Sequence, residues 1–349
     1  MRADGEPIIA GMADAAAAPD PAAVPARVGR DRHRGLELLR ATEAAALSVG
    51  RWLGRGDKSG TRDAGQTVME EALVGMPFDG RVIIGPEGGS SSLAAGRRIG
   101  VGRDRIDLAV IPVDGVSLVS RGLSQALSIA AAAEAGGILS PPPVAYMHKI
   151  AVGPAAKGSV DIADTPENNL RRIAFAMDVQ VQDLTVIMLD RPRHQALLGR
   201  VRALGARVAL ISDGDVGAAM MAAWPGSGID VLIGSGGTQE AIVAACAMRC
   251  LGGELHCRPW VRHEDEAVAV RAAGFDPGEP ISMEQLVPGR HVSIAVTGIS
   301  GGGILRGVQY HNWWAETHSL VMRAESGTVR EILTKHHVAL PPEGARRVR

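Results

Sequence analysis

The sequence predicts an α/β protein organised in two α/β halves, and three observations lead to this prediction. In the second half of the chain, short apolar runs alternate with segments of helical length, which is the pattern of βαβ units with largely parallel strands. A chain of 349 residues suffices for one large domain or two ordinary ones. Hydrophobic residues make up 46% of the chain but aromatic residues only 3%, so small and aliphatic side chains must fill the core.

The two ends of the chain differ in composition from the rest. Residues 1–32 are rich in Ala, Pro and Asp and predict a flexible tail rather than a signal peptide, because acids and prolines stand where an apolar core would be needed. Residues 339–349 predict a second tail. Between them we place an N-terminal half at 33–165 and a C-terminal half at 166–338.

The first half begins with a predicted helix near Arg34, followed by a Gly-rich polar loop over 54–66 and a second helix over 66–76. Strands are predicted at 80–85 and at 106–113, where "IDLAVIPV" runs into the turn "DGVS". The small residues of "SQALSIAAAAEAGG" fit either a helix or a buried strand.

The second half contains three predicted strands, each followed by a polar loop and a helix. The loops are "DRPRH", "SDGD" and "SGGTQE". In parallel sheets, ligands bind at the carboxyl ends of strands, where loops meet helix N-termini. Together the three loops therefore predict a binding site.

Composition also limits the partners. A formal net charge of −1 gives no electrostatic case for a nucleic acid or membrane partner, and no apolar run has the length of roughly 18 residues that a membrane span needs. Cys246, Cys250 and Cys257 predict reduced thiols in a cytoplasmic protein. Because their spacing does not match common zinc patterns, we favour buried helix thiols over a zinc site with His256 and His263.

Several long stretches, in one order along the chain, resemble the class II fructose-1,6-bisphosphatases, which are bacterial metal-dependent sugar phosphatases. They are "ATEAAALSVGRWLGRGDK", "KIAVGPAAKGSVD", "RPRHQALLGRVRALGARVALISDGDV", "IDVLIGSGGTQE" and "VTGISGGGILRGV". The resemblance implies a layered α-β-α-β-α fold, removal of the 1-phosphate from fructose 1,6-bisphosphate, Mg²⁺ or Mn²⁺ held by carboxylates, and a homodimer or homotetramer.

The resemblance also implies a set of acidic residues at the reaction centre. Its first acid matches Asp63 if one inserted residue is allowed, and Asp63 and Asp114 are the predicted catalytic residues. The predicted metal ligands are Asp63, Glu87, Asp114 and Glu240. Oxygen ligands of this kind suit hard cations that neutralise phosphate and orient water.

Three positions depart from the family pattern. Pro86 and Ile111 stand where the family has acids, and Val116 stands where it has threonine. The alkyl side chain of Ile111 offers a cation no lone pair. Asp107 lies on the same face of the predicted strand, but about 13 Å further back, which is too far for it to replace the missing acid. The sequence therefore predicts an impaired or altered metal site, in which Mg²⁺ or Mn²⁺ binds weakly, as a single ion, or not at all.

The positions that hold the sugar phosphate in the family are better preserved. They match Gly115, Ser117, Tyr146, Arg191, Arg193, Asp213, Gly214, Asp215 and Gly237. Arginine binds phosphate through paired N–H donors, although taken alone the two aspartates could simply cap a helix. Three such loops in family order favour sugar-phosphate binding.

The leading functional hypothesis is hydrolysis of a sugar (bis)phosphate at an altered metal site. Two alternatives remain open. One is a sugar-phosphate enzyme with a non-hydrolytic reaction, such as an isomerase, epimerase or lyase, and the other is a regulatory protein that binds a sugar phosphate without turnover.

Overall fold

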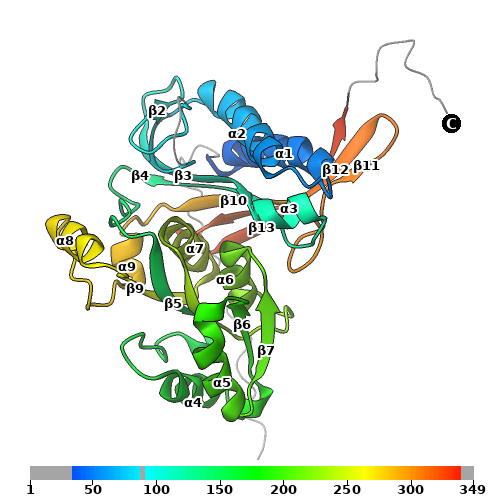
Figure 1. Cartoon of the computed structure of the whole chain (residues 1–349). Helices are drawn as coiled ribbons and strands as arrows, with labels where there is room; N and C mark the ends of the chain where they lie inside the picture. The colour runs from blue at the N-terminus through cyan, green and yellow to red at the C-terminus, as the bar shows by residue number, and fades with distance from the viewer. Residues whose placement is uncertain (1–33, 87–90, 339–349) are drawn as a thin grey trace, which may run out of the picture. The chain divides into compact units, whose positions relative to one another are not determined.

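Two mixed β-sheets alternate with three layers of helices (Figure 1). The computed structural model describes residues 34–86 and 91–338, which all belong to the unit that spans residues 33–349. The predicted tails and Glu87 lie outside the described residues.

The first sheet has eight strands in the order β11-β12-β10-β4-β3-β1-β2, with β13 also paired to β12. The segment that fitted either a helix or a strand is β4, and its run of small residues lies buried between β3 and β10. The strands are β1 (Asp79–Ile84), β2 (Arg98–Ile99), β3 (Arg105–Asp114), β4 (Leu127–Glu134), β10 (Ser293–Gly298), β11 (Gln309–Tyr310), β12 (Trp314–Arg323) and β13 (Thr328–His337).

The second sheet has five strands in the order β7-β6-β8-β5-β9. They are β5 (Tyr146–Val152), β6 (Thr185–Leu189), β7 (Arg207–Ile211), β8 (Val231–Gly237) and β9 (Glu254–Pro259). The parallel pairing expected for the alternating strands of the second half is confirmed for its three predicted strands, because β6 pairs in parallel with β7 and with β8. Among the other pairs of described strands, β1–β3 is parallel and the rest are antiparallel. The alternation of strands and helices that led to this expectation is confined to the stretch from β6 to α7.

The helices form the three remaining layers. α1 (Arg34–Val49) and α2 (Lys58–Val74) cover the outer face of the first sheet, α6 (Asp215–Ala223) and α7 (Thr238–Leu251) lie between the sheets, and α4 (Pro166–Ala176) and α5 (Gln195–Ala203) cover the second sheet (Figure 1). This is the predicted α-β-α-β-α order. The remaining helices are α3 (Val116–Arg121), α8 (Glu264–Ala272) and α9 (Met283–Leu286), with 3₁₀ turns at Gly50–Trp52, Pro154–Ala156, Val181–Asp183 and Pro192–His194.

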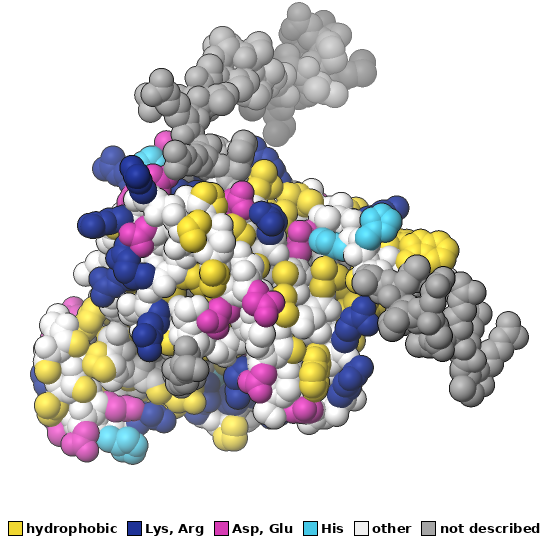
Figure 2. Space-filling view, turned by 90° about the horizontal axis from the view of Figure 1, so that it is seen from above, with side chains coloured by type: hydrophobic (Ala, Val, Ile, Leu, Met, Phe, Trp, Pro, Cys, Tyr) yellow, Lys and Arg dark blue, Asp and Glu magenta, His cyan; other side chains and the backbone are white. Residues whose placement is uncertain are grey.

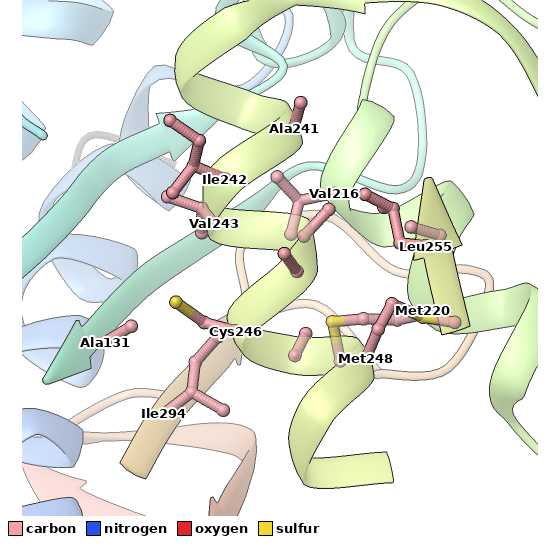
Figure 3. Packing of buried hydrophobic residues seen from close by; sticks show 14 of the residues in the cluster. Ala131, Val216, Met220, Ala241, Ile242, Val243, Cys246, Met248, Leu255 and Ile294 are labelled. Atoms are coloured by element: carbon pink, nitrogen blue, oxygen red, sulfur yellow. The ribbon is translucent and has the colours of Figure 1, made fainter. Parts of the chain in front are cut away.

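Helix α7 packs against both sheets. Figure 3 shows Cys246 on the side of Ala131 and Ile294 of the first sheet, while Met248 lies near Met220 and Leu255 on the other side. Because α7 is apolar on all of its faces, its sequence lacked an amphipathic stripe, and a layer between two sheets explains this composition. The predicted helix thiols are correct for Cys246 and Cys250, whereas the buried Cys257 lies on strand β9.

Helix α2 begins earlier than predicted. The segment 54–66 was expected to be a loop, but the helix starts at Lys58 because the side chain of Asp57 accepts a hydrogen bond of 2.8 Å from the backbone N–H of Gly60. As a result Asp63 lies on a helix rather than in a loop. Consecutive residues of a helix face different sides, so Asp63 and its neighbour Arg62 face different parts of the molecule.

The surface mixes both signs of charge. On the face shown in Figure 2, basic and acidic side chains are interspersed and hydrophobic side chains lie in small groups. Within the described part of the chain, no helix combines the length and the apolar character that crossing a membrane would require.

Candidate functional site

Four carboxyl groups lie within electrostatic range of one another between the sheets, and one of them pairs with a buried lysine. Asp114 ends β3, Asp213 follows β7, Asp215 opens α6 and Glu240 lies in the first turn of α7. The ammonium of Lys149, on β5, lies 2.6 Å from Asp215 Oδ2, and both side chains are buried. Lys149 was not predicted, and its signal in the sequence is a lysine within the apolar strand "YMHKIAV".

Two glycines at the end of β8 make room for these charged side chains. A Cβ on Gly236 would lie 1.6 Å from Asp215 Oδ2, and a Cβ on Gly237 would lie 1.8 Å from Glu240 Oε2. Gly237 was predicted to contact the substrate. The structure gives it a packing reason as well, because any side chain there would displace Glu240.

Two similar turns bring the aspartates to the site. Gly115 follows Asp114 and Gly214 follows Asp213, and both glycines have positive φ angles, of 91° and 92°. Side chains with a Cβ rarely adopt this conformation. Each turn ends a strand and starts a helix, so that Asp114 and Asp213 are held at strand ends by backbone geometry.

Burial favours the neutral form of three carboxyl groups in the cluster, those of Asp114, Asp213 and Glu240. Burial raises the pKa of Asp114 well above its ordinary value, and the charges of Glu240, Asp213 and Asp215 raise it further, against one opposing backbone hydrogen bond from Gly217. Among the described residues, Asp114 Oδ2 has no hydrogen-bond partner. A buried, unpartnered oxygen of this kind needs a donor or a cation from a ligand.

Asp213 and Glu240 follow the same logic. Burial raises the pKa of Asp213, although the backbone of Gly214 and Ser117 and the charge of Arg191 partly oppose this rise. Burial also raises the pKa of Glu240.

Lys149 keeps its proton in spite of its burial. Burial lowers its pKa, but the charge and hydrogen bond of Asp215, together with Cys257 and Glu240, leave the pKa above its ordinary value. Lys149 therefore provides one buried positive charge for Asp215 and Glu240.

The predicted phosphate-binding arginines lie on the loop after β6. Arg193 donates to Ser235 Oγ at 3.0 Å and to the Ser235 carbonyl at 2.9 Å, and its guanidinium lies 5.1 Å from the ring centre of Tyr146. Tyr146 in turn pairs with Gly237 across β5 and β8. Three predicted substrate-binding residues therefore lie at one edge of the second sheet.

Two further residues that were not predicted surround this edge. The guanidinium of Arg262 lies 5.1 Å from the ring centre of Tyr146, and the ring of Trp260 lies 5.6 Å from the guanidinium of Arg193. Two arginines on one aromatic ring form a positively charged rim that suits an anionic group. Arg191 lies beside it, held by hydrogen bonds from its guanidinium to the carbonyls of Ser212 and Asp190.

The positions that depart from the family pattern line one cavity of about 570 Å³. Pro86, Ile111 and Val116 all contribute to its wall, together with Glu240. The remaining lining residues are Arg62, Gln66, Gly85, Val110, Pro112, Val113, Pro141, Val144, Ala145, Thr238 and Gln239. Glu240 connects this cavity to the carboxylate cluster.

Asp63 is not brought to this cavity. Its side chain is exposed on α2, and its neighbour Arg62 lines the cavity instead. Among the described residues, no group of three His, Cys, Asp or Glu side chains could hold a metal ion. Glu87, another of the predicted metal ligands, lies outside the described residues.

Comparisons with known proteins cover most of the chain. The family model for bacterial fructose-1,6-bisphosphatase, glpX-encoded, matches residues 32–336. Curated relatives include a D-fructose 1,6-bisphosphatase class 2/sedoheptulose 1,7-bisphosphatase from a Synechococcus sp. strain, JA-2-3B'a(2-13), which is 36% identical over 335 residues and covers 88% of this chain and 96% of the relative. Another is fructose-1,6-bisphosphatase 1 class 2 of Escherichia coli K12, 35% identical over 324 residues with the same coverage.

Proposed function

The chain belongs to the glpX-encoded family of bacterial fructose-1,6-bisphosphatases, and from this premise we propose that it binds a sugar bisphosphate and hydrolyses its phosphomonoester. The single observation that supports the proposal best is the convergence of Asp114, Asp213, Asp215 and Glu240, with Asp215 paired to Lys149 and with Arg191 and Arg193 close by. The names of the relatives make fructose 1,6-bisphosphate and sedoheptulose 1,7-bisphosphate the first substrates to test.

In this proposal the two ends of the substrate bind to different parts of the site. Arg191 and Arg193 hold the distal phosphate, because guanidinium groups bind phosphate oxygens through paired donors. Asp213 accepts hydrogen bonds from sugar hydroxyl groups. The second phosphate then points towards the cavity lined by Ile111 and Glu240.

Hydrolysis adds water across the bond between phosphorus and the sugar oxygen. The water oxygen bonds to phosphorus and gives up one proton, the bond from phosphorus to the sugar oxygen breaks, and the sugar oxygen takes up one proton. We propose that the metal site of this chain is reduced relative to the family, and we assign no step to a divalent ion. The rest of the proposal keeps the sequence-based expectations of a cytoplasmic homo-oligomer that acts on a small phosphorylated sugar.

One observation favours a second candidate function. Pro86, Ile111 and Val116 all line the same cavity, so the departures from the family are concentrated at one place. A concentrated change of this kind is expected if the sugar-phosphate site was kept while its reaction changed or was lost. The second candidate is therefore a non-hydrolytic sugar-phosphate enzyme or a sugar-phosphate-binding regulatory protein.

Phosphate release from both bisphosphates, measured with Mg²⁺, with Mn²⁺ and with EDTA, tests the leading proposal. We expect release that is lost in Glu240→Ala and Asp114→Asn. A changed sugar detected by NMR without free phosphate would support the non-hydrolytic enzyme instead. Ligand-induced thermal stabilisation without any product would support the regulatory protein.

The double variant Ile111→Asp with Val116→Thr tests whether the altered site lost its activity through these two positions. If it did, metal-dependent phosphate release should rise in the variant, because a carboxylate and a hydroxyl are restored where the family has them. Unchanged release would contradict this explanation.

A further inference from the structure

The cavity-facing side of α2 carries an arginine where the resemblance led us to expect an acid. Arg62 and Gln66 both line the cavity, and residues four apart lie on the same face of a helix. The helix is continuous from Lys58 to Val74, so it offers no place for the inserted residue that the match to Asp63 required. Position 62, rather than position 63, therefore faces the cavity.

Among the described residues that line the cavity, Arg62 is the basic side chain and Glu240 is the acidic one. Much of the wall is apolar, including Ile111, Val113 and Val116. Apolar walls reduce the local screening of charge, which strengthens the attraction between an arginine and an anion. The same effect strengthens the repulsion between that anion and Glu240, although Lys149 lies close enough to oppose it.

The described part of the chain leaves the guanidinium of Arg62 open to a ligand. The side chain is exposed, and it makes no ion pair or hydrogen bond with any described residue. An arginine in a partly apolar cavity can bind two oxygens of one phosphate group through paired N–H donors.

We propose that Arg62 binds the phosphate group that enters this cavity, and that this binding needs no divalent cation. In this arrangement a side chain of α2 supplies positive charge at a place where the family implies carboxylate-bound metal ions. The loss of the acids at positions 86 and 111 and the presence of an arginine at position 62 then have one explanation. The inference rests on the proposed function, since it needs a phosphorylated ligand in the cavity.

Calorimetric titration of the full chain with inorganic phosphate and with fructose 1,6-bisphosphate tests the proposal. Each titration is done in EDTA and again with Mg²⁺ or Mn²⁺. We expect Kd values in EDTA within a factor of about 3 of those with the cation, which corresponds to less than 1 kcal/mol. We expect Arg62→Ala to weaken binding of inorganic phosphate about 10- to 100-fold, the usual effect of losing a charge-assisted pair.

Two further variants make the test specific. Arg62→Lys keeps the charge but loses the planar fork, so it should recover only part of the affinity. Arg121→Ala removes an exposed arginine outside the cavity lining and should leave binding unchanged. Thermal melting of each variant shows that the exposed substitutions leave the fold intact.

The outcomes separate this inference from the proposed function. Binding that appears only with Mg²⁺ or Mn²⁺, or binding in EDTA that Arg62→Ala leaves unchanged, would overturn the role of Arg62. If fructose 1,6-bisphosphate still binds in either case, the proposed function stands. Absence of binding by both ligands, with and without cation, would overturn the inference and the proposed function together.

Discussion

Gly236 is the residue at which a single added methyl group should disturb the site most. Its Cβ would lie 1.6 Å from Asp215 Oδ2 and 2.8 Å from Lys149 Nζ, so Gly236→Ala must displace the buried ion pair. We expect the free energy of unfolding to fall by about 1–3 kcal/mol, as for other overpacked positions. Urea denaturation measures this change.

Gly199→Ala is the matched control for Gly236→Ala. Gly199 lies within α5, and a Cβ there would meet no atom within 4 Å. Alanine is a better helix former than glycine, so this variant should gain about 0.5–1 kcal/mol. If both variants changed stability equally, the close approach at Gly236 would not be the cause.

Lys149 supplies the buried positive charge that pairs with Asp215, and Lys149→Met removes this charge. Loss of one partner of a buried ion pair costs about 3–5 kcal/mol at neutral pH, because the other charge stays buried. The exposed Lys157→Met is the control.

The cost of Lys149→Met should depend on pH. Burial raises the pKa of Asp114, Asp213 and Glu240 above ordinary values of 3.8 for aspartate and 4.5 for glutamate. The protonated carboxyl groups therefore stabilise the fold at pH values below their ordinary pKa. This stabilisation is lost as the pH rises through their higher pKa values in the folded protein. Denaturation at about pH 5 should show a smaller cost than at about pH 8, and an equal cost would contradict the clustering of charges.

At the scale of single elements, helix α2 shows what the sequence could not reveal. Gly60 and Gly65 suggested a loop, but both glycines are required for packing within a helix. A Cβ on Gly60 would meet Trp52 at 2.2 Å, and one on Gly65 would meet Val113 at 2.8 Å. The helix propensity of glycine is low, yet contacts between distant elements override it. Such contacts are invisible without the fold.

The same limit applied to the site. The three polar loops after predicted strands correctly indicated where the aspartates and arginines converge, because strand ends meet at one edge of a sheet. Lys149 and Arg62 were missed for different reasons. Lys149 lies on β5, where no strand was predicted, and it reaches the site through the antiparallel pairing of β5 with β8. Arg62 depends on the exact register of helix α2.

The thiols of α7 and β9 give an element-scale prediction. Burial raises the pKa of Cys246 and of Cys257 from 9.0 to about 12, and that of Cys250 rises as well. Native protein at neutral pH should therefore react with Ellman's reagent far more slowly than unfolded protein, in which all three thiols react. Rapid modification of native protein would contradict this placement.

The raised pKa values of Cys246 and Cys257 also make the stability of the fold depend on pH. The neutral thiols stabilise the folded state below pH 9.0, and this stabilisation is lost between pH 9.0 and about 12.

At the scale of the whole molecule, the order of strands differs from the order of the sequence. The first sheet takes strands from both ends of the chain, because β10, β12 and β13 return to join β4 after the second sheet is complete. The apolar core around α6 and α7 includes residues of both sheets, such as Ile129, Ile294 and Leu232. The alternation of strands and helices indicated the layers, but the return of the chain is a non-local event that no local pattern records.

Cutting the chain at the predicted boundary between residues 165 and 166 should therefore leave neither fragment folded. The fragment 1–165 keeps β3 and β4 but loses β10, so the alanine-rich β4 would become an exposed edge strand. The fragment 166–349 loses β5, which pairs with both β8 and β9 in the second sheet. Circular dichroism and size-exclusion chromatography of each fragment should show loss of ordered structure, whereas the full chain should unfold in one transition monitored at several wavelengths. A folded, monomeric fragment 1–165 would show that the two sheets are independent, and the shared core around α7 would then not be what holds them together.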